Sequence, residues 1–458
     1  MSEADSAIAQ HDLPDGLLQW LAAATNGRIT YLERHVARRE AWKVDLQLNN
    51  GETIEGFLRL QRDTGGDPQR LERETRILQA IAERGIPAPK IHAWSDEFRA
   101  VLMERDPGRS DIDKLESQQQ QRAVMEDFMR VVARFHLLDP DELALDDVML
   151  YRPKTARDCA LQEVDELVSQ WGFFMKTYND PLMSYGVKWL ERFAPETVAR
   201  VSLLQGDTGP VNFMFQGNAV STVIDWECGH YGDPLEDLGN IMVREFWNPC
   251  GGLKGLFTLY EQESGIPYDR FRAQYYAVQQ NVRGMIPIHY VANKGNDQES
   301  LAWYLCYRYI GDRATAEMLA AAMNIRVEKP ALPEDTASDD VLANSAIHMQ
   351  RKDVLPATTD KFAQSRATDV SRLIECIDRR TRFGDAVNDA ELDDLTELLG
   401  ARPDSVEGGR AEFVNLISND ALSDEVIIPV LLRKAYRDEW LYKPATDLYP
   451  GRVWADID

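Results

Sequence analysis

The chain has 458 residues, of which 44% are hydrophobic, and carries a formal net charge of −25 at pH 7. This length and apolar content suffice for large hydrophobic cores and about two to four domains. The acidic excess disfavours nucleic acid and anionic membranes as partners, because binding to either requires clustered Lys and Arg side chains.

The sequence carries no signal for export, membrane insertion or transition-metal binding. The start, Met-Ser-Glu-Ala-Asp-Ser, lacks a basic segment followed by an apolar one, and no run of about 18 apolar residues predicts a membrane span. The cysteines are odd in number, scattered and without a Cys-x-x-Cys pair, which favours reduced thiols: Cys159, Cys228, Cys250, Cys306 and Cys376. The seven His residues show no metal-binding spacing. We therefore expect a cytosolic protein.

The first predicted elements are two strands and a helix. Alternating segments at 42–48 and 54–60 flank the turn Asn49-Asn-Gly-Glu52, which predicts a β-rich region over about 29–61. A helix follows from Pro68 to Arg84 and ends at Gly85.

One acidic side chain of this helix occupies a position that should face the core. Glu74 falls on the same stripe as Leu71, Leu78 and Ile81, and a buried carboxylate is costly unless a cation pairs with it. Arg59 is the candidate, because it shares a strand face with Phe57. The alternative is that Arg59 and Glu74 are both solvated.

Helices dominate after a strand at 100–105 and the turn Pro107-Gly-Arg109, which would lead into a second lobe. An apolar stripe at three- and four-residue steps predicts an amphipathic core helix, and His136 continues it as a core histidine. The stripe consists of Met125, Phe128, Val132 and Phe135.

The most informative stretch is Gln205-Gly-Asp-Thr-Gly-Pro-Val-Asn212. A short apolar strand at 201–204 precedes it, and segments 213–215 and 220–224 around a Gly217-Asn218 turn predict a hairpin. This hairpin would return Asp225 to the end where Asp207 and Asn212 lie. The glycines of the stretch indicate a tight loop whose backbone passes close to a ligand.

These three polar residues have the spacing of a kinase-type site for ATP and Mg²⁺. In such sites one Asp accepts the proton of the substrate hydroxyl, an Asn five positions on binds Mg²⁺, and a later Asp binds metal against the nucleotide phosphates. Asp207, Asn212 and Asp225 fit these roles in that order. Hard oxygen ligands suit Mg²⁺, and no thiol or imidazole is needed.

The remaining sequence predicts helices. Asp233, Pro234 and Glu236 have the pattern of a helix start, so Asp233 and Asp237 are expected to be structural. An aromatic-rich helical stretch runs to about Ala322, and a polar, Pro-containing linker follows.

Beyond the linker the sequence predicts a C-terminal helical module. One helix of it has Leu392, Leu395, Leu398 and Leu399 on its apolar face and stops at Gly400. Another begins over Val426 to Leu432, with Pro429 in its first turn.

The chain resembles the aminoglycoside phosphotransferase family, which includes choline kinases and the kinase domains fused to certain acyl-CoA dehydrogenases. The resemblance covers roughly residues 25–325. It rests on segments 205–215, 223–227, 232–238 and 57–60, and on Glu74 before Pro87-Ala-Pro89.

The resemblance implies an α+β, bilobal protein-kinase-like fold with a small β-rich N-lobe and a larger, mainly helical C-lobe. A C-terminal all-α domain, similar to a small helical domain appended to such phosphotransferases, would follow. The expected boundaries are an N-terminal extension at 1–24, the N-lobe at 25–104, the C-lobe at 105–326, a linker at 327–340 and the helical domain at 341–458.

The resemblance also implies a site in which the γ-phosphoryl group of ATP passes to a hydroxyl of a small molecule. Asp207 would be the base, Asn212 and Asp225 the Mg²⁺ ligands, and Arg59 the α/β-phosphate ligand held by Glu74. The segment 37–42, with Arg38, would cover the phosphates. The hinge that meets adenine would be Met103, Glu104 and Arg105.

Two residues depart from the family pattern. Gln205 stands where the family usually has His, and Val211 stands where it often has Gly. A glutamine can still form hydrogen bonds with the backbone, but it cannot titrate.

The acceptor stays open, as does the oligomeric state. A hydroxyacyl-CoA or another hydroxylated metabolite is the main expectation. Two alternatives remain: a nucleotide-binding regulator that transfers nothing, and an antibiotic kinase whose acidic surface suits polycationic aminoglycosides.

Overall fold

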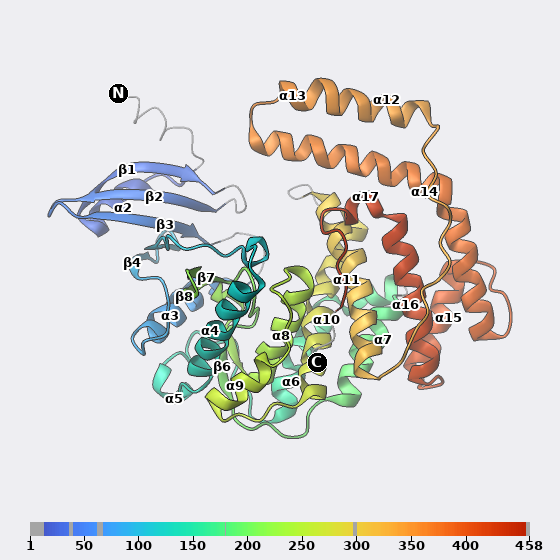
Figure 1. Ribbon diagram of the computed structural model, residues 1–458, viewed down its shortest axis with the longest axis horizontal. Helices are drawn as coiled ribbons and strands as arrows, with labels where there is room; N and C mark the ends of the chain where they lie inside the picture. Colours follow the sequence, from blue (N-terminus) through green and yellow to red (C-terminus); the bar gives the residue numbers. More distant parts are fainter. Residues whose placement is uncertain (1–12, 36–39, 62–66, 179, 296–299, 455–458) are drawn as a thin grey trace. The chain divides into compact units, whose positions relative to one another are not determined.

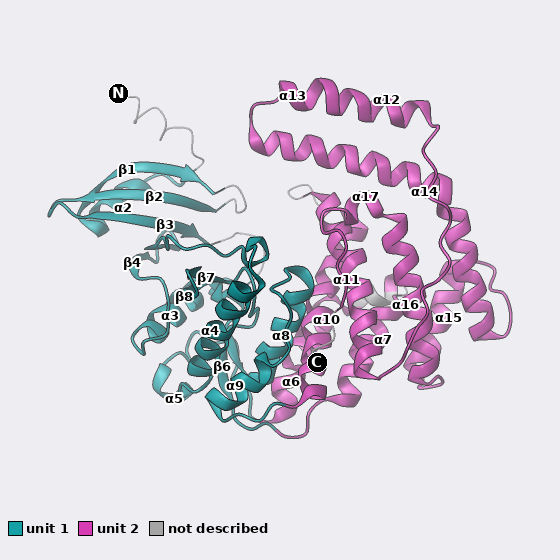
Figure 2. Ribbon diagram, in the orientation of Figure 1, with its two compact units in different colours: residues 1–154, 198–268, 457–458 teal, residues 155–197, 269–456 magenta. Residues whose placement is uncertain are grey.

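A computed structural model describes residues 13–35, 40–61, 67–178, 180–295 and 300–454 (Figure 1). The chain divides into two compact units (Figure 2). Unit 1 comprises residues 1–154, 198–268 and 457–458, and unit 2 comprises residues 155–197 and 269–456. A small β-sheet region is followed by a mainly helical remainder, which confirms the predicted α+β fold class. The lobe and linker boundaries given above stay predictions.

Unit 1 begins with a five-stranded antiparallel sheet of strand order β1-β2-β3-β5-β4. Its strands are β1 (Gly27–Arg34), β2 (Ala41–Leu48), β3 (Thr53–Leu60), β4 (Ile91–Ser95) and β5 (Ala100–Glu104). The predicted hairpin is present, with Ala41 opposite Arg59 and Gln47 opposite Thr53. Its register places Arg59 near the end of β3, beside Val101 of β5.

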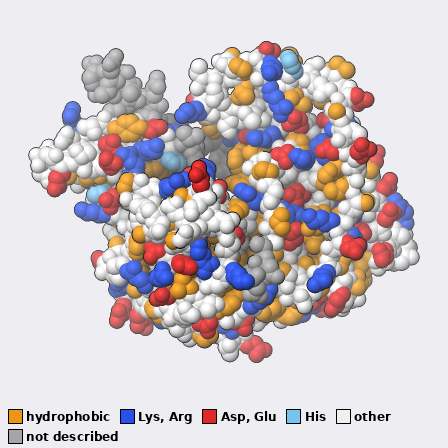
Figure 3. Space-filling view, viewed as in Figure 1, with side chains coloured by type: hydrophobic (Ala, Val, Ile, Leu, Met, Phe, Trp, Pro, Cys, Tyr) orange, Lys and Arg blue, Asp and Glu red, His pale blue; other side chains and the backbone are white. Residues whose placement is uncertain are grey.

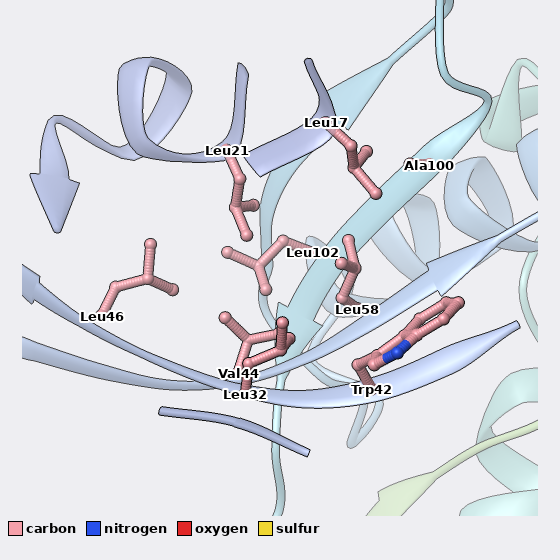
Figure 4. Packing of buried hydrophobic residues seen from close by; sticks show 9 residues of the cluster. All are labelled: Leu17, Leu21, Leu32, Trp42, Val44, Leu46, Leu58, Ala100 and Leu102. Atoms are coloured by element: carbon pink, nitrogen blue, oxygen red, sulfur yellow. The ribbon is translucent and has the colours of Figure 1, made fainter. Parts of the chain in front are cut away.

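The core of this sheet lies under helix α2 (Leu17–Thr25). Figure 4 shows side chains from α2 and from four strands pointing toward one another. They are Leu17, Leu21, Leu32, Trp42, Val44, Leu46, Leu58, Ala100 and Leu102. Full burial of one such leucine contributes about 1.5–3 kcal/mol, so this cluster fixes the strand positions that carry Arg59.

Helix α3 (Arg70–Ala82) follows the third strand and buries the predicted stripe. Leu71, Leu78 and Ile81 are buried, and Glu74 is only 1% exposed. The helix stops before Gly85, whose φ of 74° few other residues tolerate. The carboxylate of Glu74 is therefore held inside the protein, facing the sheet.

The rest of unit 1 surrounds the central loop. Its helices are the 3₁₀ turn η1 (Ile112–Lys114), α4 (Gln118–His136), α5 (Pro140–Leu143), the 3₁₀ turn η2 (Trp226–Cys228), α8 (Pro234–Trp247) and α9 (Leu256–Ser264). Its short strands are β6 (Ser202–Leu204), β7 (Phe213–Gln216), β8 (Ala219–Val223) and β9 (His230–Gly232). β7 and β8 form the predicted hairpin, with Phe213 opposite Val223.

The apolar stripe of α4 is buried as predicted, and it packs against this hairpin. The rings of Phe128 and Phe213 stack with centroids 4.1 Å apart. At the start of α8, Asp233 accepts a hydrogen bond from the Leu235 backbone N–H, which is the expected cap. These contacts fix the two ends of the segment that carries Asp225.

All the regular elements among the described residues of unit 2 are helices. Its helices are α6 (Ala156–Thr177), α7 (Pro181–Phe193), α10 (Arg270–Lys294), α11 (Leu301–Ala322), α12 (Val341–Met349), the π-helical η3 (Gln350–Val354), α13 (Leu355–Ala357), α14 (Lys361–Leu399), α15 (Val406–Ser418), α16 (Asp424–Leu441) and α17 (Lys443–Thr446). Residues 325–340 form neither helix nor strand. α14 ends at the predicted glycine, Gly400.

One helix start was predicted wrongly. α16 begins at Asp424, and Pro429 lies inside it instead of in its first turn. The segment after Ser423 already adopts helical geometry because Asp424 and Glu425 suit a helix N-terminus, where acidic side chains interact favourably with the helix dipole.

The last helices of unit 2 share a core with its earlier ones. Tyr309 of α11 stacks on Tyr442, with ring centroids 4.0 Å apart. Arg313 of α11 is bound by the Glu439 carboxylate of α16. On the molecular face shown in Figure 3, acidic and basic side chains are interspersed. Among the described helices, none is both long and apolar enough to cross a membrane.

Candidate active site

The central motif forms a compact loop between β6 and β7. Gly206 has φ 77°, and a Cβ atom there would lie 2.2 Å from the carbonyl oxygen of Cys228. Gly209 has φ 139°, and a Cβ atom there would lie 2.7 Å from Cβ of Arg244. The two glycines therefore let the predicted tight loop pass between η2 and α8, and the close approach of its backbone to a ligand stays a prediction.

A buried carboxylate holds the start of this loop. Asp237 accepts hydrogen bonds from the backbone N–H groups of Gln205 (3.0 Å) and Gly206 (3.1 Å). His136 Nε2 lies 3.0 Å from the same carboxylate, and His136 Nδ1 lies 2.7 Å from the Tyr260 hydroxyl. Burial would raise the pKa of Asp237, but these hydrogen bonds outweigh it and lower the pKa. Asp237 and His136 are thus structural, as predicted. Asp237 holds the backbone of the loop, and His136 holds Asp237.

The Gln205 side chain connects the two ends of the motif. Its Nε2 donates to the carbonyl oxygen of Asn212 at 3.2 Å and to that of Ile224. The Ile224 N–H also donates to the Asn212 carbonyl at 3.0 Å. The segment that carries Asn212 is therefore fastened to the segment that carries Asp225.

Asn212 is oriented by Asp207. Its Nδ2 donates to the backbone oxygen of Asp207 at 2.7 Å and to Asp207 Oδ2 at 2.9 Å. Both amide hydrogens are used in this way, so the amide oxygen Oδ1 points away from Asp207. That oxygen is the atom a metal ion would require.

Asp225 lies in the same cluster. The Asp225 charge contributes to a raised pKa of Asp207, whose larger cause is burial and which Arg244 partly offsets. Asp225 and Val211 both have a left-handed backbone, with φ 62° and 73°. For Val211, a β-branched residue, this conformation is a strained outlier. Such strain concentrates at functional sites. The structure thus brings Asp207, Asn212 and Asp225 together.

Arg59 and Glu74 form an ion pair with Nη1 2.5 Å from Oε1. Arg59 Nη2 lies 3.5 Å from Glu227, and Arg70 Nη2 lies 3.2 Å from the same carboxylate. Burial would lower the pKa of Arg59, but Glu74, Asp225 and Glu227 raise it. The strand cation, the helix carboxylate and the end of the Asp225 segment therefore belong to one cluster.

Arg244 is the main residue of the site that sequence reasoning missed. Its guanidinium binds both carboxylate oxygens of Asp207, with Nε 2.8 Å from Oδ1 and Nη2 against Oδ2. Arg70 and Glu227 were missed as well. Arg244 follows Asp237 by seven residues on one helix, which places both on one face, but this spacing alone does not show that Arg244 reaches Asp207.

The predicted hinge and covering loop are placed only in part. Met103 is buried in β5, and Glu104 ends that strand. Arg105 Nη2 pairs with Asp45 at 2.8 Å and with Glu55 at 3.3 Å, so its guanidinium is bound to the sheet. Arg38 lies outside the described residues. The nucleotide-binding roles of these four residues stay predictions.

The donor atoms of the cluster fit Mg²⁺. Asn212 and Asp225 offer hard oxygen atoms, which Mg²⁺ prefers. The nearby Cys228 thiol is a poor ligand for a soft metal, because burial raises its pKa to about 12 and keeps the proton on sulfur.

Comparison with known proteins identifies relatives of this architecture. The sequence model described as "Phosphotransferase enzyme family" (APH) matches residues 43–275, which is more than half of the chain. Acyl-CoA dehydrogenase family member 11 of Pongo abelii is 25% identical over 210 residues, which cover 43% of this chain and 26% of that protein. The chain thus spans about a quarter of the length of this curated relative.

A solved structure shows the same fold. A protein of Ralstonia eutropha that is provisionally called an aminoglycoside phosphotransferase has a TM-score of 0.54 and 22% identity. The match covers 68% of this chain and 98% of that one. The choline kinase LicA of Streptococcus pneumoniae is 11% identical with a TM-score of 0.47, covering 70% and 100% of the two chains.

Proposed function

Because the chain belongs to the phosphotransferase enzyme family, we propose that it transfers the γ-phosphoryl group of ATP to a hydroxyl group of a small molecule. The observation that carries this proposal is the joint placement of Asp207, Asn212 and Asp225, fastened by Gln205 and adjacent to the Arg59–Glu74 ion pair. Catalysis at such a site rests on positioning and charge neutralisation, without a covalent enzyme intermediate.

Each side chain has one role in the proposal. Asp207 accepts the proton of the acceptor hydroxyl. Its carboxylate has about four acceptor positions. Arg244 and Asn212 use two on Oδ2 and one on Oδ1, which leaves a position on Oδ1 for a hydroxyl.

The nucleotide is held by the cations and oxygen atoms around this carboxylate. Arg59 binds the α/β-phosphates, and Glu74 fixes its orientation. Asn212 Oδ1 and the Asp225 carboxylate would hold Mg²⁺. When bound, Mg²⁺ supplies neutralisation of the phosphate charge.

The acceptor class is proposed from the relatives. The curated relative is an acyl-CoA dehydrogenase family member, and only about a quarter of its length matches this chain. A phosphotransferase region within such a protein makes hydroxyacyl-CoA thioesters the first acceptors to test. Other hydroxylated metabolites, choline and aminoglycosides complete the panel, because the solved structures include kinases named for the last two classes.

The test is ADP release from ATP and Mg²⁺ with each acceptor. Asp207→Asn keeps the side-chain shape but removes the carboxylate that takes the proton, so we expect a fall of at least about 10²-fold. Asp147→Asn is the matched control, because Asp147 pairs with Arg76 in an exposed ion pair far along the chain from the motif. Turnover unchanged in Asp207→Asn would reject Asp207 as the base. Mg²⁺-dependent ATP binding without turnover on the panel would favour a nucleotide-binding regulator.

A further inference from the structure

Arg244 has contacts that the roles above leave unexplained. Its guanidinium binds the two carboxylate oxygens of Asp207 in a bidentate pair. Arg–carboxylate pairs of this kind are strong and geometrically specific. The carboxylate proposed to accept a proton is thus also held by a cation, and none of the roles above explains that contact.

The position of Arg244 is built into the fold. It follows Asp237 by two helical turns on the same face of α8, and Asp237 binds the loop at Gln205 and Gly206. Its aliphatic stem lies over Gly209, where a Cβ atom would come within 2.7 Å of Arg244 Cβ. One helix face therefore orders the backbone of the loop and places a guanidinium on its carboxylate.

The guanidinium also lies beside the proposed metal ligands. Asp207 Oδ2 accepts hydrogen bonds from both Arg244 Nη2 and Asn212 Nδ2. Within the described part of the chain, Arg244 Nη1 has no hydrogen-bond partner, and the side chain is 24% exposed. Of the five N–H donors of the guanidinium, three are therefore left at the junction of the base and the metal ligands, two on Nη1 and one on Nη2.

We propose that Arg244 is a further catalytic residue, whose outer N–H groups bind the phosphoryl group during its transfer. This rests on the proposed function. In the transfer, the acceptor oxygen forms a bond to Pγ while the bond from Pγ to the β-phosphate oxygen breaks. The bonding electron pair leaves with ADP, and the hydroxyl proton passes to Asp207. Arg244 then stabilises the negative charge on the three oxygens of the phosphoryl group. Arginines supplied in cis have this role in other phosphoryl-transfer enzymes.

The bidentate pair gives this arginine a second effect. While Asp207 is ionised, it holds the guanidinium in one orientation, so no reorganisation is needed when the phosphoryl group arrives. A lysine at the same position would retain the charge but could not bind two carboxylate oxygens and a phosphoryl oxygen in one plane. Arg244→Lys and Arg244→Gln therefore separate charge from geometry.

The test measures binding, so that it needs no knowledge of the acceptor. Calorimetry at pH 8 gives the Kd of Mg²⁺–ADP with and without aluminium fluoride, which mimics the phosphoryl group in transit. For the unaltered protein we expect aluminium fluoride to tighten ADP binding by at least about 10²-fold, as transition-state analogues do. Arg244→Gln should bind Mg²⁺–ADP as before and lose most of this gain, and Arg244→Lys should keep a part of it.

A matched control is Arg122→Gln, because Arg122 pairs with Glu126 on the surface of α4 and should leave the gain intact. If Arg244→Gln does not fold, Arg244→Lys alone decides, since it must show a reduced gain. The inference would be overturned if aluminium fluoride tightened ADP binding as much in the deciding Arg244 variant as in the unaltered protein. It would also be overturned if the affinity for Mg²⁺–ADP alone fell by the same factor as the affinity in the presence of aluminium fluoride. Mg²⁺–ADP binding by the unaltered protein without any gain would also overturn it, and no Mg²⁺–ADP binding at all would instead reject the proposed function.

Discussion

The side-chain amide of Gln205 donates a hydrogen bond to the carbonyl oxygen of Ile224, the residue before Asp225. The same nitrogen donates to the Asn212 carbonyl at 3.2 Å, so one amide fastens both proposed metal-binding segments. Gln205 is fully buried, and no imidazole is needed for this contact. The residue that departs from the family pattern therefore has a positional role that does not depend on titration.

Replacing Gln205 should loosen the metal site. Gln205→Glu keeps the shape but presents an acceptor-only carboxylate to two carbonyl oxygens, so we expect a loss of about 1–3 kcal/mol in unfolding free energy. We also expect a higher Mg²⁺ concentration for half-maximal ADP release. For Gln205→His we expect both effects to be smaller than in Gln205→Glu but still present, because a neutral imidazole donates only one hydrogen bond. Equal Mg²⁺ dependence in Gln205→Glu and the unaltered protein would contradict this role.

Much of this site could be predicted because its residues are close in sequence. The strand, tight loop and hairpin from 202 to 223 return Asp225 to Asp207 by local geometry alone. Glu74 could be anticipated because a carboxylate on an apolar helix stripe requires a cation. Arg59 was the candidate, since strand alternation gives its face.

Arg244 and Arg70 could not be predicted in the same way. Helical periodicity shows which face of a helix is apolar, but many arginines lie at the edges of such faces. Only the packing of α8 against Gly209 determines that the Arg244 side chain reaches Asp207. Arg70 reaches Glu227 because α3 packs against η2, which is a contact across 157 positions of sequence that no local pattern encodes.

Substitutions at Gly206 and Gly217 distinguish the cost of backbone strain from the cost of close packing. Both have positive φ, at 77° and 61°. A Cβ atom at Gly206 would lie 2.2 Å from the Cys228 carbonyl oxygen, whereas one at Gly217 would have no neighbour within 4 Å. Gly217→Ala should therefore cost only about 1–2 kcal/mol of left-handed strain.

Gly206→Ala should cost more stability than its control and also displace the loop that carries Asp207. We expect loss of ADP release in Gly206→Ala and near-normal release in Gly217→Ala, with stability measured by chemical denaturation. Similar losses in the two variants would show that the Cys228 carbonyl does not confine the loop.

Arg59→Lys tests why this site has an arginine. Arg59 spans Glu74 at 2.5 Å and Glu227 at 3.5 Å with separate nitrogens, which one ammonium group cannot reproduce at both distances. We expect the KM for ATP to rise several-fold, while the unfolding free energy falls by no more than about 1–2 kcal/mol because the buried Glu74 keeps a cationic partner. Arg59→Met would leave Glu74 uncompensated, with a loss of about 3–5 kcal/mol. An unchanged KM for ATP in Arg59→Lys would argue against phosphate binding by this residue.

A buried histidine makes the stability of unit 2 depend on pH. His289 Nδ1 lies 2.5 Å from Asp180 Oδ2, and Nε2 lies 2.5 Å from Asp312 Oδ1. Burial and Arg308 lower the pKa of His289, but the two carboxylates outweigh them and raise it to about 9. Both ring nitrogens donate, so the folded protein favours the imidazolium form.

The direction of the pH dependence follows from the difference between the pKa of His289 in the folded state and its pKa in the unfolded state. The pKa of an unfolded histidine is about 6.5. Since the folded value is higher, the stabilisation is fully present below about pH 6.5 and is lost as the pH rises through about 9, with an upper limit of about 3 kcal/mol.

We expect the denaturation midpoint of the unaltered protein to fall over this range. His289→Gln should be less stable at pH 6.5 and show a smaller change with pH. His348→Gln, which alters an exposed histidine of α12, should retain the full change. The same pH dependence in His289→Gln as in the unaltered protein would mean that other groups cause it, because a glutamine side chain does not titrate.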